Sequence, residues 1–302
     1  MNGIINVYKE KGFTSHDVVA KLRGILHMKK IGHTGTLDPD AVGVLPVCVG
    51  KATKVCELLT DRDKTYVAEV RLGVTTDTLD LSGEILTEQP VQVTEEQLQE
   101  ILPEFTGSIQ QIPPMYSAIK INGKKLYELA RQGQEVERKP RQVTIHELSL
   151  RQMNLAEQEF TMEVTCSKGT YIRSLCADIG ERLGCGAAMK SLIRTRVGQF
   201  TAEQAMTLSE IEAFCRENEP EKLLLPIDAV FDGLARCQAG EKAMRFLENG
   251  NRMAARLCQY QAEKKAPENG EQVRMYGADG SFYAIYRYNR QDGMYHIVKM
   301  FH

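Results

Sequence analysis

The N-terminal part of the chain shows two different periods in the spacing of its apolar side chains. Residues 4–8 form a short apolar segment typical of a β-strand, and Thr14 or Ser15 is suited to cap a helix after the turn that follows. That helix has one apolar stripe at helical spacing, which consists of Val18, Val19, Leu22, Ile25 and Leu26. A loop then leads to a continuous apolar run over residues 42–49 and to a short helix predicted over residues 52–59.

Strand and helix patterns alternate further along the chain. Every second side chain of one predicted strand faces inward, namely Tyr66, Ala68, Val70 and Leu72, and a later strand repeats this pattern with Phe160, Met162, Val164 and Cys166. Helices are predicted over residues 94–102 and 170–183. The second of these has a stripe expected to be buried, which consists of Ile172, Leu175, Cys176, Ile179 and Leu183.

Residues 223–228 have the pattern expected at the end of a large domain. A helix is predicted beyond them over residues 240–249, and short strands are predicted over residues 282–288 and 295–300. We therefore expect two domains, residues 1–230 and residues 231–302.

Composition limits the cellular location and the kinds of site that are expected. No apolar run approaches the ~20 residues of a membrane span, and the N-terminus lacks the charged and apolar regions of a secretory signal. We therefore expect a cytoplasmic protein. The eight cysteines never fall in C-x-x-C spacing, so we expect reduced, mostly buried thiols and no bound metal.

Charge is distributed unevenly, although the net charge of the 302 residues is only −2. Residues 120–141 contain seven Lys and Arg against three Glu, and residues 187–200 contain three basic residues and no acid. Residues 203–222 contain six Glu against two basic residues. Such a distribution fits a basic face for phosphate, and it also fits ordinary solvated faces.

The loop over residues 30–47 contains the strongest candidate for chemistry. Gly32 and Gly35 allow backbone conformations with positive φ, and Pro39 disfavours the helical conformation for Asp38. A carboxylate fixed in this way could be a reactive acid presented from a loop. It could equally be a turn residue or a helix cap.

The full sequence of this loop favours the reactive acid over the turn residue and the helix cap. Its sequence, GHTGTLDP followed by DAVGVLPV, resembles the catalytic loop of the TruB family of tRNA pseudouridine synthases. The resemblance implies that Asp38 is the catalytic residue and that the T-loop uridine (U55) of tRNA is isomerised without a cofactor. It also implies an α+β protein with the pseudouridine synthase fold, a mixed and largely antiparallel sheet flanked by helices and loops, and a small C-terminal β-rich domain of the PUA-like RNA-binding type.

Further motifs extend the resemblance to positions that line the base pocket in the family. The segment KTY matches a family segment whose Tyr, here Tyr66, stacks on the target base. In SKGTYIR, the resemblance implies that Arg173 pairs with Asp38 and that Tyr171 lines the base pocket. Leu192 matches an apolar residue that packs on the base.

Other matching residues are expected to contact RNA. His33 matches a residue that fills the stack vacated by the flipped base. Lys9 keeps its family position, although Glu10 stands where the family usually has Pro. Residues 110–142 resemble the bacterial family's mobile thumb, with Lys120, Lys124 and Lys125 as RNA contacts. The expected partner is the T-arm stem-loop of tRNA, and no protein partner is expected to be required.

Physical chemistry adds two expectations and leaves some alternatives open. An Arg in the first turn of a helix lies at the unfavourable end of the helix dipole, so Arg173 is expected to have an anionic partner. A nearby cation lowers a carboxylate pKa by about 1–3 units, which would keep Asp38 ionised. The residues leave open whether Asp38 attacks C1′ or the uracil ring, and which group takes the C5 proton. Another base-acting glycosylase or transglycosylase, and a tRNA-folding chaperone without chemistry, remain as alternative functions.

Overall fold

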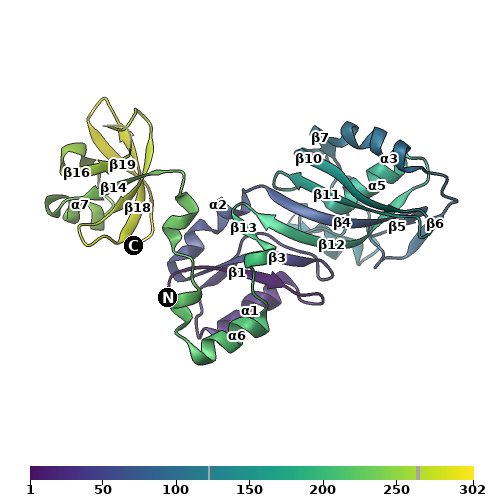
Figure 1. Ribbon diagram of the computed structural model, residues 1–302, viewed down its shortest axis with the longest axis horizontal. Helices are drawn as coiled ribbons and strands as arrows, with labels where there is room; N and C mark the ends of the chain where they lie inside the picture. The colour runs from purple at the N-terminus through teal and green to yellow at the C-terminus, as the bar shows by residue number, and fades with distance from the viewer. Residues whose placement is uncertain (122, 263–265) are drawn as a thin grey trace.

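Two β-sheets of unequal size form the framework of the computed structural model, which describes residues 1–121, 123–262 and 266–302 (Figure 1). The larger sheet belongs to the N-terminal part of the chain, and the smaller sheet lies at one end of the elongated molecule. No helix among the described residues is long and apolar enough to cross a lipid bilayer.

The larger sheet is mixed and mostly antiparallel. Its main path has the order β1-β3-β12-β4-β11-β10-β7, with β2 added on β3 and β13 on β12, and only β3 and β12 pair in parallel. The strands are β1 (Gly3–Lys9), β2 (Ile31–His33), β3 (Val42–Val49), β4 (Lys64–Leu72), β7 (Gly107–Gln111), β10 (Arg141–Asn154), β11 (Glu159–Cys166), β12 (Ala187–Val197) and β13 (Phe200–Thr201).

Helices cover this sheet in two groups. The α-helices of this part are α1 (Ser15–Ile25), α2 (Cys56–Thr60), α3 (Glu95–Ile101), α4 (Leu126–Ala130), α5 (Ile172–Arg182) and α6 (Leu208–Glu217). Short 3₁₀ helices are η1 (Gly50–Val55), η2 (Leu102–Phe105), η3 (Ala202–Gln204) and η4 (Pro220–Leu223). Helices α1 and α6 pack together near β1 and β3, whereas α5 packs against β12 and β4 (Figure 1).

The apolar run over residues 42–49 is continuous because both faces of β3 are buried. Leu45 and Val47 pack with α1 and α6 on one face. Val44 and Cys48 pack on the other face in a cluster that includes Ile285 of the smaller sheet. A strand covered on both sides has no solvent face, so it shows no polar alternation.

The predicted elements in the larger sheet are present with small shifts at their ends. Thr14 caps α1 through a capping box with Asp17. The helix predicted over residues 170–183 begins at Ile172, because Tyr171 has extended backbone angles and occupies the N-cap position. The helix predicted over residues 52–59 is α-helical only from Cys56, since η1 forms the preceding turns.

Between the end of β7 at Gln111 and the start of β10 at Arg141, the described residues of the segment that resembles a thumb add no strand to the large sheet. After β7 it runs irregularly to a short ribbon, β8 (Lys120–Ile121) and β9 (Lys124–Lys125), and then to α4. Asn122, part of the motif in this segment, lies outside the described residues. A second ribbon, β5 (Val74–Thr76) with β6 (Ile85–Glu88), lies at the far end of the molecule from the smaller sheet (Figure 1).

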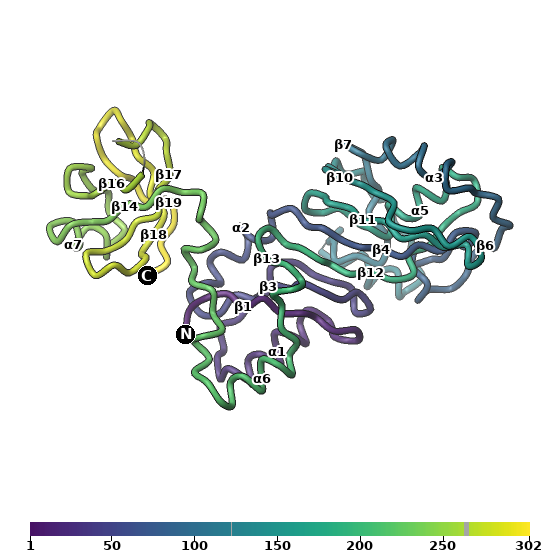
Figure 2. Tube along the Cα trace, viewed as in Figure 1, coloured from purple at the N-terminus to yellow at the C-terminus, as the bar shows by residue number. Residues whose placement is uncertain are grey.

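The smaller sheet follows the large one through η5 (Ile227–Phe231), along the connection drawn in green in Figure 2. Its strand order is β15-β19-β18-β17-β14-β16, with its own buried core. The strands are β14 (Ala235–Ala239), β15 (Met253–Ala254), β16 (Cys258–Gln261), β17 (Gln272–Tyr276), β18 (Phe282–Asn289) and β19 (Met294–Met300), with η6 (Glu241–Ala243), α7 (Met244–Glu248) and η7 (Ala255–Leu257) between them. The predicted C-terminal strands are confirmed, and the predicted helix over residues 240–249 is shorter because η6 forms its first turn.

Candidate active site

Asp38 lies in the loop between β2 and β3, and hydrogen bonds hold this loop on both sides of it. Leu37 is 3% exposed, and its N–H donates to the Ser15 hydroxyl over 3.0 Å. The Pro39 carbonyl accepts from the Gly12 N–H at 2.9 Å and from the Lys9 ammonium at 3.0 Å. The backbone around Asp38 is therefore anchored to β1, to α1 and to the turn between them.

Arg173 is the ion-pair partner of Asp38. Its Nε lies 3.1 Å from Asp38 Oδ2, and its Nη1 lies 3.6 Å from Asp80 Oδ2. Nη1 also donates to the Thr78 carbonyl at 3.0 Å, and Nη2 donates to the Tyr116 carbonyl at 2.8 Å. The anionic partner predicted for an Arg in the first turn of α5 is thus present.

The pKa of Asp38 is raised above its ordinary value, not lowered as expected from Arg173 alone. Burial of the carboxylate raises the pKa, Arg173 opposes this, and Asp80 raises the pKa further. The side chain still has 43% of its surface exposed, because it lines a cavity instead of being sealed in the core. The sequence identified the cation correctly but carried no measure of the desolvation.

This cavity has a volume of about 280 Å³ and brings together five of the predicted site residues: Asp38, Tyr66, Tyr171, Arg173 and Leu192. They come from four different segments, namely the loop before β3, strand β4, the start of α5 and strand β12. Tyr66 and Leu192 are 8% exposed each. Burial raises the pKa of the Tyr66 hydroxyl, although Arg194 opposes the shift, so the phenol remains protonated at neutral pH.

His33 is half-buried at the end of β2 and is absent from the lining of the cavity. Its ring packs edge-on against His16 with 5.3 Å between centroids, and its Nδ1 accepts from the Gly35 N–H at 3.4 Å. Burial lowers the pKa of His33, so its ring is neutral at pH 7. Its predicted place in the vacated RNA stack stays a prediction.

The four lysines predicted to contact substrate differ in their surroundings. Lys9 is fully buried, and its ammonium donates to the Pro39 and Glu10 carbonyls. Such a position suits support of the loop better than contact with RNA. Lys120 and Lys124 are exposed on the β8–β9 ribbon, while Lys125 is partly covered and donates to the Tyr127 hydroxyl at 3.2 Å.

Sequence reasoning assigned no role to several charged residues at or next to the cavity, among them Lys64, Arg194 and Asp80. Lys64 and Arg194 line the cavity, and Asp80 lies behind Arg173. Strand alternation could have identified Lys64 and Arg194, because residues two positions apart in a strand face the same side. Lys64 precedes Tyr66 by two positions, and Arg194 follows Leu192 by two.

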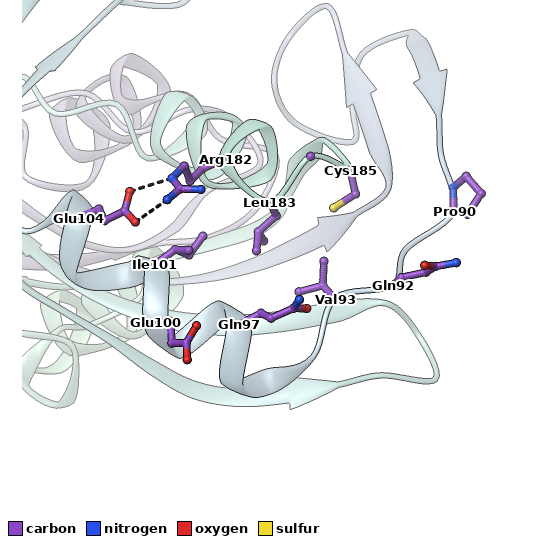
Figure 3. A pocket seen from close by; sticks show the side chains of 11 residues that line it. Pro90, Gln92, Val93, Gln97, Glu100, Ile101, Glu104, Arg182, Leu183 and Cys185 are labelled. Carbon is purple, nitrogen blue, oxygen red and sulfur yellow. Dashed lines mark hydrogen bonds and ion pairs between the residues drawn. The ribbon is translucent and has the colours of Figure 1, made fainter.

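A larger cavity, of about 770 Å³, lies near α3 and the end of α5 (Figure 3). Its lining, as far as the described residues show, includes none of the predicted site residues. Arg182 and Glu104 form two hydrogen bonds of 2.8 Å across it, which satisfies both charges (Figure 3). The described residues also contain no group of three side chains suited to hold a metal ion.

Known proteins are similar in sequence to this chain over most of its length. Residues 23–172 match the TruB family pseudouridylate synthase (N terminal domain), and residues 173–232 match the tRNA pseudouridylate synthase B C-terminal domain. A tRNA pseudouridine synthase B of Lachnoclostridium phytofermentans is 53% identical over 308 residues, covering 100% of both chains. Another from Cupriavidus metallidurans is 47% identical over 289 residues, covering 95% of this chain and 90% of the relative.

Solved structures show the same fold. A chain from a crystal structure of a Cbf5-Nop10-Gar1 complex has a TM-score of 0.73 at 28% identity, covering 99% of this chain and 85% of that chain. A chain from an H/ACA RNP bound to a substrate RNA containing 2′-deoxyuridine has a TM-score of 0.72 at 26% identity, with the same coverage of both chains. Together with the sequence matches over residues 23–232, these similarities show that the chain belongs to the TruB family of pseudouridine synthases.

Proposed function

We propose that this chain converts a uridine of tRNA into pseudouridine and that Asp38 is its catalytic carboxylate. The observation that carries the proposal is the cavity in which Asp38, held by Arg173, faces the same space as Tyr66, Tyr171 and Leu192. The relatives named tRNA pseudouridine synthase B support it, since they match at 47% and 53% identity over nearly the whole chain. By the resemblance described above, the target is U55 of the T loop.

The reaction makes three demands on such a cavity. The C1′–N1 bond of the uridine must break, the detached base must stay in place and turn, and a C1′–C5 bond must form. Asp38 supplies a carboxylate that can attack covalently or stabilise the sugar without a cofactor. Two tyrosine rings and Leu192 supply apolar walls that retain a flat base.

RNA must reach this cavity with the target base flipped out of its stack, at a cost of a few kcal/mol. The exposed Lys120 and Lys124 lie on the ribbon that follows residues 117 and 118 of the cavity lining. We assign residues 110–142 as the RNA-binding thumb, residues 1–230 as the catalytic domain and residues 231–302 as the PUA-like domain. We further propose that the enzyme acts in the cytoplasm without an obligatory protein partner.

The alternative functions have less support from the geometry. A hydrolytic glycosidase needs a second carboxylate that can act as an acid. Asp80 is the nearby candidate, but it is engaged by Arg173, by the Thr78 hydroxyl at 2.8 Å and by the Ser82 N–H at 3.0 Å. A chaperone without chemistry would have no use for a partly desolvated carboxylate in a cavity.

One experiment separates the three functions. Unmodified tRNA is incubated with the wild-type protein or with Asp38→Asn, and position 55 is analysed for pseudouridine, for an abasic site and for unchanged uridine. Pseudouridine formed by the wild type alone supports the proposal. An abasic site would indicate a glycosylase, and unchanged uridine with bound tRNA would indicate a chaperone.

A further inference from the structure

The cavity around Asp38 contains more positive charge than its ion pairs neutralise. Four cations line it, Lys64, Lys168, Arg173 and Arg194, whereas Asp38 is the one acidic side chain in the described lining. Arg173 is paired with Asp38 and Asp80, and Lys168 is paired with Asp61 at 2.7 Å. For Lys64 and Arg194, the described part of the chain offers no carboxylate at ion-pair distance.

These two unpaired cations are also deeply buried. Lys64 is 6% exposed and Arg194 is 1% exposed. Removing a cation from water without a carboxylate partner costs several kcal/mol, so such groups are concentrated at functional sites. The excess charge therefore points to a ligand that is negative, or becomes negative, inside the cavity.

Strand geometry places both cations beside the Tyr66 ring. Lys64 and Tyr66 are alternate residues of β4 and share a face, and Arg194 is the direct cross-strand partner of Tyr66 on β12. A methyl group built on Gly35 would lie 3.8 Å from Lys64 Cε and 3.9 Å from Arg194 Nη1. The two cations thus converge on the loop that presents Asp38.

Hydrogen bonding separates the roles of the two cations. Arg194 donates from Nε to the Val44 carbonyl at 2.7 Å, and its Nη groups reach the carbonyls of Thr36 and Gly35 at 3.5 and 3.4 Å. It is therefore a positioning residue for the Asp38 loop. The Lys64 ammonium donates to the Thr60 and Arg62 carbonyls at 2.8 and 2.6 Å. It has three N–H groups, so one remains without an acceptor among the described residues.

We propose that Lys64 is a further catalytic residue, whose ammonium stabilises the negative charge on the uracil ring when the C1′–N1 bond breaks. The inference rests on the proposed function of the cavity. The electron pair of that bond leaves with the base, so the ring and its carbonyl oxygens become anionic. When C1′–C5 forms, C5 loses one proton and N1 gains one, so the base ends neutral. A fixed cation that interacts strongly with the base only while the base is anionic stabilises the transition state more than the bound uridine. It therefore lowers the barrier to the reaction.

A phosphate of the RNA is the other anion that these cations could bind. Phosphates stay on the backbone, and the cation suited to meet them is Lys168, whose side chain is 59% exposed. Lys64 instead lies on the buried face that it shares with Tyr66. A cavity of about 280 Å³ also suits a base better than a stretch of backbone.

The charge on Lys64 should be visible in the pH dependence. The pKa of Lys64 is lowered to about 8, chiefly by burial and also by Arg194, while three weaker influences oppose the shift. The titratable or charged groups around it are Arg194, Cys166, Asp61 and Asp63, with Tyr66 two positions along the same strand and Asp38, Arg173 and Lys168 elsewhere in the cavity lining. The ammonium is present below pH 8 and is lost as the pH rises through 8, so kcat/KM should fall over that range. Lys9 has a pKa lowered to about 8 as well, so the profile must be assigned with variants.

Lys64→Met removes the charge at similar length, and Lys64→Arg keeps a charge that does not titrate in this range. Single-turnover pseudouridine formation at saturating enzyme and the Kd for tRNA are measured for both variants. We expect Lys64→Met to lower the rate by about 100-fold or more with Kd changed by less than about threefold. We expect Lys64→Arg to recover at least about a tenth of the wild-type rate, with the alkaline fall in kcat/KM shifted to higher pH. Lys222→Met, which removes an exposed lysine near α6, is the control and should match the wild type.

Four outcomes would overturn the inference. An unchanged saturated rate with a weakened Kd would make Lys64 a phosphate contact. A Lys64→Arg variant as slow as Lys64→Met, with a lower melting temperature in both, would make Lys64 a structural donor to the Thr60 and Arg62 carbonyls. A fully active Lys64→Met would contradict this inference alone, whereas a wild type that forms no pseudouridine would contradict both it and the proposed function.

Discussion

Nε of Arg173 lies 3.1 Å from Oδ2 of Asp38, while the other two nitrogens of the same guanidinium contact different segments. Nη1 contacts Asp80 and the Thr78 carbonyl, and Nη2 donates to the Tyr116 carbonyl. Tyr116 belongs to the segment that leads into the basic ribbon. One buried side chain therefore joins the candidate catalytic carboxylate to the start of the proposed RNA-binding thumb.

Asp38 should be essential for chemistry and unimportant for RNA affinity. We expect Asp38→Asn or Asp38→Ala to abolish pseudouridine formation, because neither amide nor methyl can replace a carboxylate nucleophile or counter-charge. T-arm binding should stay within about tenfold, or about 1.4 kcal/mol, since the side chain points into the cavity. The assay is single-turnover conversion of tRNA together with a filter-binding Kd.

Asp40→Asn is the matched control for that measurement. Asp40 is an exposed carboxylate in the same loop and lies outside the described lining of the cavity. It should retain activity close to that of the wild type. Turnover by Asp38→Asn near the wild-type rate would contradict the assignment of Asp38 as the catalytic carboxylate.

Arg173→Lys should slow the reaction by about tenfold or more with little change in RNA affinity. The planar fork of a guanidinium can grip both oxygens of one carboxylate. The structure instead shows one contact to Asp38 and the remaining nitrogens distributed over Asp80 and two carbonyls. A lysine offers a single point charge and cannot hold all these positions at once. An exposed pair would contribute about 0–1 kcal/mol, so a silent substitution would show that the pair does not support catalysis.

Arg151→Lys is the control for this variant. Arg151 pairs with Glu163 through a side chain that is 56% exposed, on the hairpin formed by β10 and β11. The same substitution there tests the effect of losing a guanidinium far from the cavity. It should leave the single-turnover rate unchanged.

Residues 120–141 should exchange their amide hydrogens quickly in the free protein and slowly in the tRNA complex. Before β10 begins at Arg141, the described part of this segment has little regular structure. It consists of two strands of two residues each, β8 and β9, and the five-residue helix α4. Its exposed lysines can gain phosphate contacts that offset the entropy of ordering. Hydrogen exchange measured by mass spectrometry with and without T-arm RNA tests this. Equal protection in both states would contradict the thumb assignment, and β3 serves as an internal reference that should not change.

The sequence was sufficient for local elements and for the residues carried by motifs. The stripe from Ile172 to Ile179 and the alternation from Tyr66 to Leu72 both correspond to buried faces of α5 and β4. One cavity contains five motif residues, whose roles in catalysis and base binding stay predictions.

What the sequence could not supply was the environment of each charge. Lys9 was expected to contact substrate, but in the fold its ammonium donates a hydrogen bond to the Pro39 carbonyl, a contact between residues 30 positions apart that the sequence does not show. The raised pKa of Asp38 depends on how much water the cavity excludes, which is a property of the whole fold. The sequence also did not reveal why a glycine stands at position 43. Strands β3 and β12 approach so closely there that a methyl group on Gly43 would lie 2.2 Å from the Arg194 carbonyl oxygen.

Asp178 provides a test of stability that is independent of RNA. It is half-buried on α5, and its pKa is raised to about 6, chiefly by burial and also by Glu181. Because the folded-state pKa lies above the ordinary value of 3.8, the stabilising contribution of its protonated form is complete below pH 3.8 and is lost as the pH rises through 6. Asp178→Asn mimics the protonated form at every pH, so it should be more stable than the wild type at pH 7–8.

The gain should be about 1 kcal/mol, less than the full pKa shift would give, because part of the side chain remains solvated. The difference should shrink as the pH falls through 6 and vanish toward pH 4, which urea unfolding at a series of pH values can measure. A difference between Asp178→Asn and the wild type that stays constant from pH 4 to pH 8 would mean that the side chain acts through packing, because a titrating charge must give a pH-dependent free energy of unfolding.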